Sequence, residues 1–304
     1  MAPNGSIGSD FMYIGNYSTE TRTVGCQQLR LLVPDPLSSN LSVSKTRIVD
    51  TLAESSRRLN SSPARDVVRM YAIEGNLSTD SDRQLEGFAT ENGNFLATAS
   101  YPFYQPDNIW IHEYIHTRQR FAPIAGAQWT TEGTATYLAA RLSLEQGLTS
   151  PREYDAFLAR TTLLSNSTSL NQVDDRSRYA YLWGAAALST MEYELSASNT
   201  SVGDAVEFMN SQRTVSQTEL DRWTDERTRD NYSLDSVVFA QQQPTPRYLL
   251  GPSWLSPQDR HLIPYLQKPL VRLASLAFSL LFLHSLVISY TPYSITGSIS
   301  SLKD

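Results

Sequence analysis

The apolar positions of the chain change from strand periodicity in its first third to helical periodicity beyond it. Residues 10–17 and 24–33 mix aromatic and β-branched residues between Gly and Pro, which predicts strands. Residues 44–60 repeat apolar positions at helical spacing, and residues 67–73 and 94–100 again predict strands. The pattern therefore predicts a β-rich beginning over residues 1–43, followed by a small mixed α/β unit.

Beyond residue 101 the pattern is helical almost to residue 258. Asp107 or Asn108 is a candidate cap for the first helix of this part, and Thr130 or Thr131 starts the second. The expected helices cover residues 108–120, 130–147, 176–197, 202–210 and 216–229, with a further helix that opens at the capping box of residues 150–153. The fold class expected is α+β, with a mainly helical second half.

The C-terminal region contains an uncharged apolar segment. Residues 273–290 are eighteen residues without Asp, Glu, Lys or Arg, which is just long enough to span a bilayer. The sequence therefore predicts a transmembrane helix within residues 269–291, and a buried or aberrant C-terminal helix is the alternative. Lys268 and Arg272 would place the preceding domain on the cytoplasmic side if the positive-inside bias held.

Sequons for N-glycosylation favour the opposite side of the membrane. Eight Asn-x-Ser/Thr sequons occur among thirteen asparagines, where Ser and Thr content predicts roughly three. This excess predicts a membrane protein with an extracellular, glycosylated catalytic part. The alternative is that a chain rich in Ser and Thr makes sequons by composition, so the orientation stays open.

Charge and cysteine content exclude several classes of function. The chain of 304 residues has a formal net charge of -6 and no block of Lys and Arg, so we expect no nucleic-acid partner. Its single cysteine, Cys26, rules out an intrachain disulfide and a zinc site built from thiolates. A metal ion would have to be held by histidine and carboxylate side chains.

Two of the four histidines lie four residues apart. His112 and His116 belong to the expected first helix of the second half, so both imidazoles project from one face, about one turn apart. That spacing suits two ligands of one zinc ion, and Glu113 beside them suits a general base. The alternative is a solvated helix face with two incidental histidines.

Catalytic zinc takes three protein ligands and keeps a fourth position for water, so a third candidate is needed. Glu132 opens the next expected helix, and a helix antiparallel to the first would bring its carboxylate back to the metal. The alternative is that Glu132 only complements the dipole at a helix N-terminus.

The combination of HExxH with Trp129-Thr130-Thr131-Glu132-Gly133-Thr134-Ala135 resembles the gluzincins, the superfamily of thermolysin and the membrane alanyl and glycyl aminopeptidases. The similarity covers roughly residues 67–250. It implies a thermolysin-like zincin catalytic domain, placed here at residues 44–258, with one Zn²⁺ per chain held by His112, His116 and Glu132. It also implies that Glu113 activates water, and that Tyr181 of Tyr181-Leu182-Trp183-Gly184 donates its phenol proton to the developing oxyanion. Since Tyr179 is nearby, a packing role for Tyr181 is the alternative.

The sequence departs from the family pattern at two places. Aminopeptidases carry a Gly-x-Met-Glu-Asn strand whose glutamate binds the substrate amine, whereas here residues 87–92 read Gly-Phe-Ala-Thr-Glu-Asn. Glu91 is the candidate substrate-binding residue, or else part of an Asn92-Gly93 hairpin turn. Only fifteen residues separate His116 from Glu132, fewer than is usual in the aminopeptidases.

The function expected is zinc-dependent hydrolysis of peptide bonds in a peptide or protein substrate, in an aminopeptidase-like manner. The edge of residues 94–100 or 86–89 would pair with an extended peptide. One alternative is a catalytically inactive, membrane-associated binding protein on the same fold, and another is zinc hydrolysis of a different substrate class. No sequence feature sets the oligomeric state.

Overall fold

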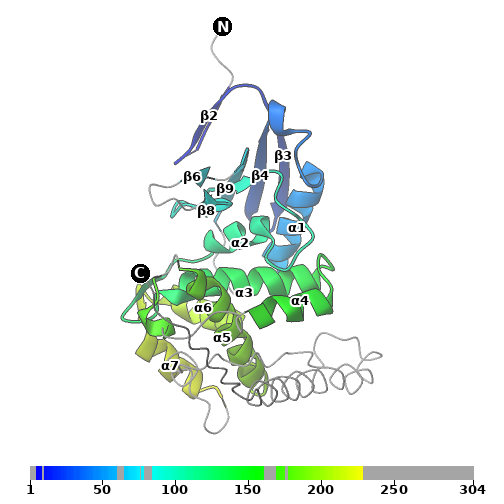
Figure 1. Cartoon of the computed structure of the whole chain (residues 1–304). Coiled ribbons are helices and arrows are strands. Elements are labelled where there is room, and N and C mark those ends of the chain that lie inside the picture. Colours follow the sequence, from blue (N-terminus) through cyan, green and yellow to red (C-terminus); the bar gives the residue numbers. More distant parts are fainter. Residues whose placement is uncertain are drawn as a thin grey trace, which may run out of the picture. The chain divides into compact units, whose positions relative to one another are not determined.

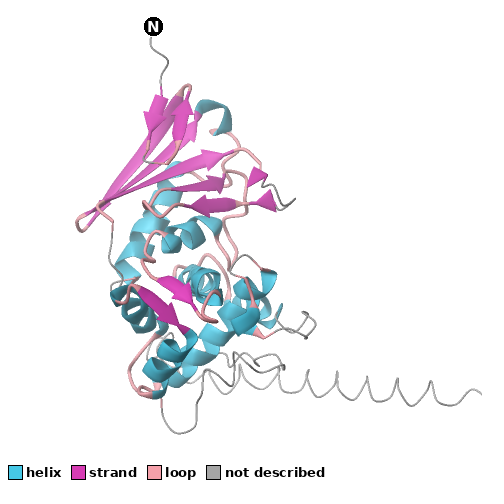
Figure 2. Cartoon of the chain, turned by 90° about the vertical axis from the view of Figure 1, so that its left-hand side faces the viewer, coloured by secondary structure: helices cyan, strands magenta, loops and turns pink. Residues whose placement is uncertain are grey.

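The computed structural model describes residues 5–8, 10–59, 65–75, 77–78, 84–160, 169–174 and 177–228. In this part of the chain, the larger sheet and helix α1 (Lys45–Arg58) lie towards one end and most of the other helices towards the other, as Figures 1 and 2 show. The α+β fold expected from the sequence is confirmed, with a sheet first and helices after it.

A mixed five-stranded sheet forms the first part of the fold. Its strands follow the order β3-β4-β5-β9-β8. The two central pairs, β4 with β5 and β5 with β9, are parallel, whereas β3 with β4 and β8 with β9 are antiparallel. The strands are β3 (Tyr17–Val24), β4 (Gln27–Pro34), β5 (Val67–Ile73), β8 (Gly87–Ala89) and β9 (Phe95–Thr98). Within the described residues, β8 is thus an edge strand of this sheet.

Three smaller strand pairs complete the β structure. β1 (Gly5–Ile7) pairs with β2 (Met12–Ile14), and β6 (Leu77–Ser78) pairs with β7 (Gln84–Leu85). The pair of β10 (Ala122–Ile124) and β11 (Thr214–Ser216) is parallel and lies among the helices in Figure 2. The expectation of a purely helical stretch beyond residue 101 is therefore wrong at these two short strands.

Seven α-helices lie in the described part of the chain. They are α1 (Lys45–Arg58), α2 (Ile109–His116), α3 (Trp129–Glu145), α4 (Pro151–Leu158), α5 (Arg178–Ser196), α6 (Val202–Ser211) and α7 (Gln217–Asp225), with 3₁₀ turns η1 (Asp35–Leu37) and η3 (Leu170–Gln172). The side chain of Asn108 caps α2 by accepting from two backbone N–H groups, and capping boxes open α4 at Ser150 and α7 at Ser216. These caps are the ones that the sequence predicts.

α2 ends four residues before the expected position. The hydroxyl of Thr117 donates to the carbonyl of Tyr114 at 2.7 Å. The N–H groups of Arg118 and Gln119 then bond to carbonyls three residues back rather than four. This tightening into a 3₁₀ turn ends the α-helix at His116.

The expected division after residue 43 falls inside the sheet. β3 and β4 precede that position, yet β4 pairs along five residues with β5, which follows it. β3 and β4 therefore belong to the same sheet as the strands beside the histidine helix. β3 itself was not expected, because its polar, Thr-rich sequence lacks an apolar alternation.

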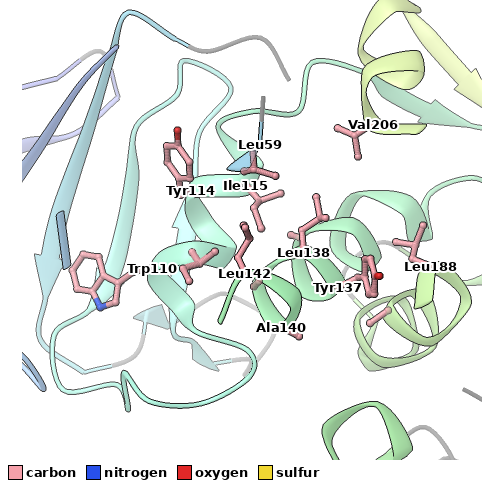
Figure 3. Packing of buried hydrophobic residues seen from close by; sticks show 14 of the residues in the cluster. Leu59, Trp110, Tyr114, Ile115, Tyr137, Leu138, Ala140, Leu142, Leu188 and Val206 are labelled. Atoms are coloured by element: carbon pink, nitrogen blue, oxygen red, sulfur yellow. The ribbon is translucent and has the colours of Figure 1, made fainter. Parts of the chain in front are cut away.

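The core surrounds α2, which lies between the sheet and α3 (Figure 1). The Trp110 ring meets the ring of Phe95 in β9 edge to face, with centroids 6.3 Å apart. On the other side, Ile115 of α2 is buried with Leu138 and Leu142 of α3, as Figure 3 shows. Each such side chain contributes about 2 kcal/mol on burial, so α2 is held on both faces.

The sequon asparagines that can be placed are all at the surface. Asn16, Asn40 and Asn199 are exposed, the last with a positive φ of 57°. The remaining five sequons, at Asn4, Asn60, Asn76, Asn166 and Asn231, lie outside the described residues. Glycosylation and an extracellular location stay predictions.

None of the described helices combines the length and apolar character that crossing a bilayer requires. The segment 273–290, for which the sequence predicts a membrane helix, lies outside the described residues. The membrane prediction is therefore neither confirmed nor contradicted.

Asp155 of α4 gives a pH-dependent prediction for stability. Burial raises the pKa of its carboxyl to about 6, and its Oδ1 has no hydrogen-bond partner within the described part of the chain. The folded protein therefore binds a proton more tightly than the unfolded chain, so this carboxylate costs stability at neutral pH, and the cost disappears as the pH falls to about 4. We expect Asp155→Asn to stabilise the protein by about 1 kcal/mol at pH 7, discounted for partial solvent access, and not at pH 4. Urea denaturation of the wild type and the variant at both pH values measures the difference in the free energy of unfolding.

The exposed Asp66 provides the control, since Asp66→Asn changes charge without relieving burial. Equal effects of the two substitutions at pH 7 would contradict the burial argument.

Candidate metal and catalytic site

Two histidines of α2 and one glutamate of α3 converge on one point. Nε2 of His112 lies 3.1 Å from Nε2 of His116. Oε2 of Glu132 lies 3.2 Å from each of these nitrogens. Among the described residues, these three form the group of His, Cys, Asp and Glu side chains able to hold a metal ion.

The close crossing of α3 and α5 places Glu132. A Cβ at Gly184 would lie 2.7 Å from the Cα of Gly133 and 3.2 Å from the Trp129 ring. Only glycine at both positions lets the two backbones approach this closely. Glu132 precedes one of these glycines, and Tyr181 lies one turn before the other, so the crossing sets the positions of both side chains.

Each imidazole is oriented through its other ring nitrogen. Nδ1 of His112 lies 3.1 Å from a carboxylate oxygen of Asp107, and Nδ1 of His116 lies 2.8 Å from Oε1 of Gln119. A carboxylate or amide oxygen accepts a hydrogen bond, so each Nδ1 carries the proton in the neutral ring. The Nε2 lone pairs then point into the cluster. The sequence predicted Asp107 only as a helix cap and did not predict Gln119.

The donor set fits zinc. Three lone-pair atoms, two imidazole nitrogens and one carboxylate oxygen, lie 3.1–3.2 Å from one another. Tetrahedral zinc with ligands at about 2.0–2.1 Å separates them by about 3.3 Å. Lone pairs facing one another repel unless a cation or a proton lies between them. His112, His116 and Glu132 would therefore hold the ion.

The charges in the cluster keep the Glu132 carboxylate ionised. Burial favours its neutral form, but the two histidines outweigh burial and hold the pKa of this carboxyl below its usual range. Burial on its own would lower the pKa of His112, whereas Asp107 and Glu132 raise it above the ordinary value. The carboxylates of Asp107 and Glu132 thus favour positive charge at the two imidazoles.

Glu113 is buried beside the histidines, and Gly87 of β8 packs directly against it. A Cβ at position 87 would collide with the Glu113 carboxylate and lie 2.7 Å from its Cγ. Burial raises the pKa of Glu113 to about 7, opposed by the two histidines and assisted by Glu132. A carboxyl group whose pKa lies near 7 is able both to accept and to return a proton at neutral pH.

Tyr181 faces the site, and Tyr179 does not. The Tyr181 ring stacks on His112, with centroids 5.7 Å apart and planes 9° apart. Burial, then the negative charges of Glu132 and Glu113, raise the pKa of the Tyr181 phenol above its usual range. Tyr179 instead packs edge to face against Trp183 at 5.1 Å. The Tyr181 phenol thus stays protonated at neutral pH and lies against His112.

Glu91 is not brought to the cluster. It is exposed in the turn between β8 and β9, where its carbonyl accepts from Nη2 of Arg65 at 2.6 Å. The turn closes by a bond from the Gly93 N–H to the Thr90 carbonyl, with a φ of 81° at Gly93. Gly87, at the other end of β8, is the residue that touches Glu113. Glu91 therefore lies in the hairpin turn that the sequence offered as the alternative to a substrate-binding role.

The fold matches those of solved M1 zinc metallopeptidases. An M1 zinc metallopeptidase from Deinococcus radiodurans, in a mutant form bound to a Tyr-Ser-Ala substrate, has a TM-score of 0.57 and 18% identity over 77% of this chain and 55% of its own. Another structure of that enzyme gives 0.55 and 19%, over 79% and 55%. An aminopeptidase N family protein from Idiomarina loihiensis gives 0.54 and 14%, over 74% and 49%.

These likenesses establish the fold, and this chain spans about half the length of each structure. No protein-family model matches the sequence, and the search of curated proteins found no match. Fold and site together define a chain with the fold of the solved M1 zinc metallopeptidases and with a cluster of His112, His116 and Glu132 able to hold a metal ion.

Proposed function

We propose that this chain is a zinc-dependent peptidase in which a water molecule attacks the carbonyl of a peptide bond. The observation that carries the proposal is the convergence of His112, His116 and Glu132 within 3.1–3.2 Å beside the buried Glu113. The likeness in fold to the M1 zinc metallopeptidases supports it.

The chemistry divides between the ion and the protein. Held by the three ligands, zinc would supply Lewis acidity, which makes water more acidic and a carbonyl more electrophilic. Glu113 takes the proton of the attacking water and delivers it to the leaving amine. Tyr181 donates its phenol O–H towards the carbonyl oxygen as negative charge develops there.

The open edge of β8 is the proposed docking line for an extended substrate. The bonds from Thr98 N–H to Glu86 O and from Thr90 N–H to Asn94 O fix the alternation of this antiparallel pair. Gly87 and Ala89 therefore turn their N–H and C=O groups away from β9. A peptide that adds as a further strand would pass beside Glu113.

Ala89→Pro tests this docking line. Proline at this position removes an outward N–H but no bond of the β8–β9 ladder, so the fold should persist. Losing one substrate hydrogen bond of about 1–1.5 kcal/mol should raise KM about tenfold with little change in melting temperature. Steady-state kinetics on a long peptide measures it, with Ala89→Gly, which keeps the N–H, as the control. An unchanged KM would remove β8 from the substrate site.

Aminopeptidase-like action is the finer form of the proposal. It is supported by the shared fold with an aminopeptidase N family protein. Glu91, the residue expected to bind the substrate amine, lies in the β8–β9 turn. The proposal therefore names no group that binds a free amine.

A panel of substrates on the zinc-loaded protein tests both levels. Cleavage of aminoacyl substrates but not of N-acetylated, internally quenched peptides supports an aminopeptidase, and the reverse result an endopeptidase. Resistance of every member would overturn the peptidase proposal, and leave a binding protein on this fold or a hydrolase of another substrate class.

A further inference from the structure

Gln119 follows the histidine helix and folds back onto it. Its backbone N–H bonds to the carbonyl of His116 at 3.1 Å, in the tight turn that ends α2. Its half-buried side chain then makes two contacts: Oε1 lies 2.8 Å from Nδ1 of His116, and Nε2 lies 2.8 Å from the carbonyl oxygen of Thr131. Thr131 directly precedes Glu132.

The carbonyl oxygen of Thr131 determines how the Gln119 amide is oriented. A backbone carbonyl only accepts hydrogen bonds, so the NH₂ group of Gln119 must face it. The amide oxygen is then left for His116, whose Nδ1 must carry the hydrogen. His116 is thereby held in the tautomer that turns the Nε2 lone pair towards His112 and Glu132.

The same side chain joins two helices that carry ligands. His116 closes α2, and Thr131 lies in the first turn of α3, one residue before Glu132. Glutamine suits this position because it accepts at one end and donates at the other. Asp107, which orients His112, makes its contact from the loop before α2 and does not bridge to α3 in this way.

We propose that Gln119 is a positioning residue of the metal centre, which fixes the tautomer of His116 and ties the second ligand to the third. The inference rests on the proposed function, since it requires that the cluster binds zinc. It assigns a role to the motif His116-Thr117-Arg118-Gln119, which extends HExxH by three residues.

Two substitutions separate the two contacts. Gln119→Met keeps the shape of the side chain but loses both hydrogen bonds, whereas Gln119→Glu keeps an acceptor for His116 and loses the donor to Thr131. Gln128→Met is the matched control: Gln128 is also half-buried, and its Oε1 accepts from the backbone of Gly126 at 3.1 Å.

The measurement is the zinc dissociation constant by competition with a chromogenic chelator, with the melting temperature of the zinc-free proteins as the check of folding. We expect Q119M to weaken zinc binding about 10- to 100-fold, as loss of an outer-shell partner does elsewhere. Q119E should recover affinity to within about fivefold of the wild type, and Q128M should match the wild type. Gln119→Ala replaces Q119M in the comparison if the latter does not fold.

The outcomes distinguish the two levels of the argument. Wild-type affinity in Q119M or Q119A overturns the role of Gln119 and leaves the metal centre intact. Equal weakening in Q119M and Q119E overturns the assignment of the bond to His116. A wild-type protein that binds no zinc overturns the metal centre and the role of Gln119 together.

Discussion

Replacing Glu113 by glutamine should reduce kcat about 10²- to 10⁴-fold while leaving zinc binding intact. Glutamine fills the same space against Gly87 but cannot take a proton from the attacking water. Glu113 follows the ligand His112 in the chain but is not one of the three residues that would hold the metal. The substitution should therefore leave zinc bound. The check is kcat on the best substrate of the panel, together with zinc content of the same preparation.

The exposed Glu207 of α6 supplies the control for charge removal, since Glu207→Gln should leave kcat unchanged. Activity of Glu113→Gln within tenfold of the wild type would show that another group takes the proton.

Adding one methyl group at the crossing of α3 and α5 should damage both stability and catalysis. In Gly184→Ala the new Cβ lies 2.7 Å from the Gly133 Cα, so the helices must separate. Overpacking of this kind costs about 1–3 kcal/mol. Because the crossing positions Glu132 and Tyr181, kcat/KM should also fall by about 10²-fold, as small misplacements of catalytic groups do.

Urea denaturation and kinetics on Gly184→Ala test this, with Ser143→Ala in α3 as the control. Ser143 is buried and its hydroxyl has no partner within the described residues, so its removal should be neutral or slightly stabilising. A Gly184→Ala protein with wild-type stability and kinetics would show that the glycine contact does not set the site.

The pair of histidines could be predicted from the sequence because their spacing alone fixes their geometry on a helix. His112 and His116 need only α2 to meet, and Asn108 marks its start. Glu132 was predicted as the third ligand by assuming that the next helix runs antiparallel to the first, and the resemblance implied the same role, since nothing local says that α3 returns to α2. What brings it there is the contact between Gly133 and Gly184, two residues fifty-one positions apart whose approach depends on tertiary packing.

The sequence did not predict the two residues that orient the histidines. Asp107 reads as a helix cap, although its carboxylate lies against the ring nitrogen of His112 five residues away. Gln119 has no predicted role until α3 is in place, because one of its partners is the distant carbonyl of Thr131. Glu91 was predicted either as a substrate-binding residue or as part of a hairpin turn, and its backbone forms the turn. β10 and β11 were also missed, since three-residue strands paired across about ninety positions leave no local pattern.

Zinc content by elemental analysis, on the wild type and on Glu132→Ala, tests the central claim most directly. We expect one zinc per wild-type chain after dialysis against trace zinc, and its loss in Glu132→Ala, because two imidazoles alone bind the ion weakly. A wild-type protein without zinc, or a Glu132→Ala protein that keeps it, would contradict the metal centre described here.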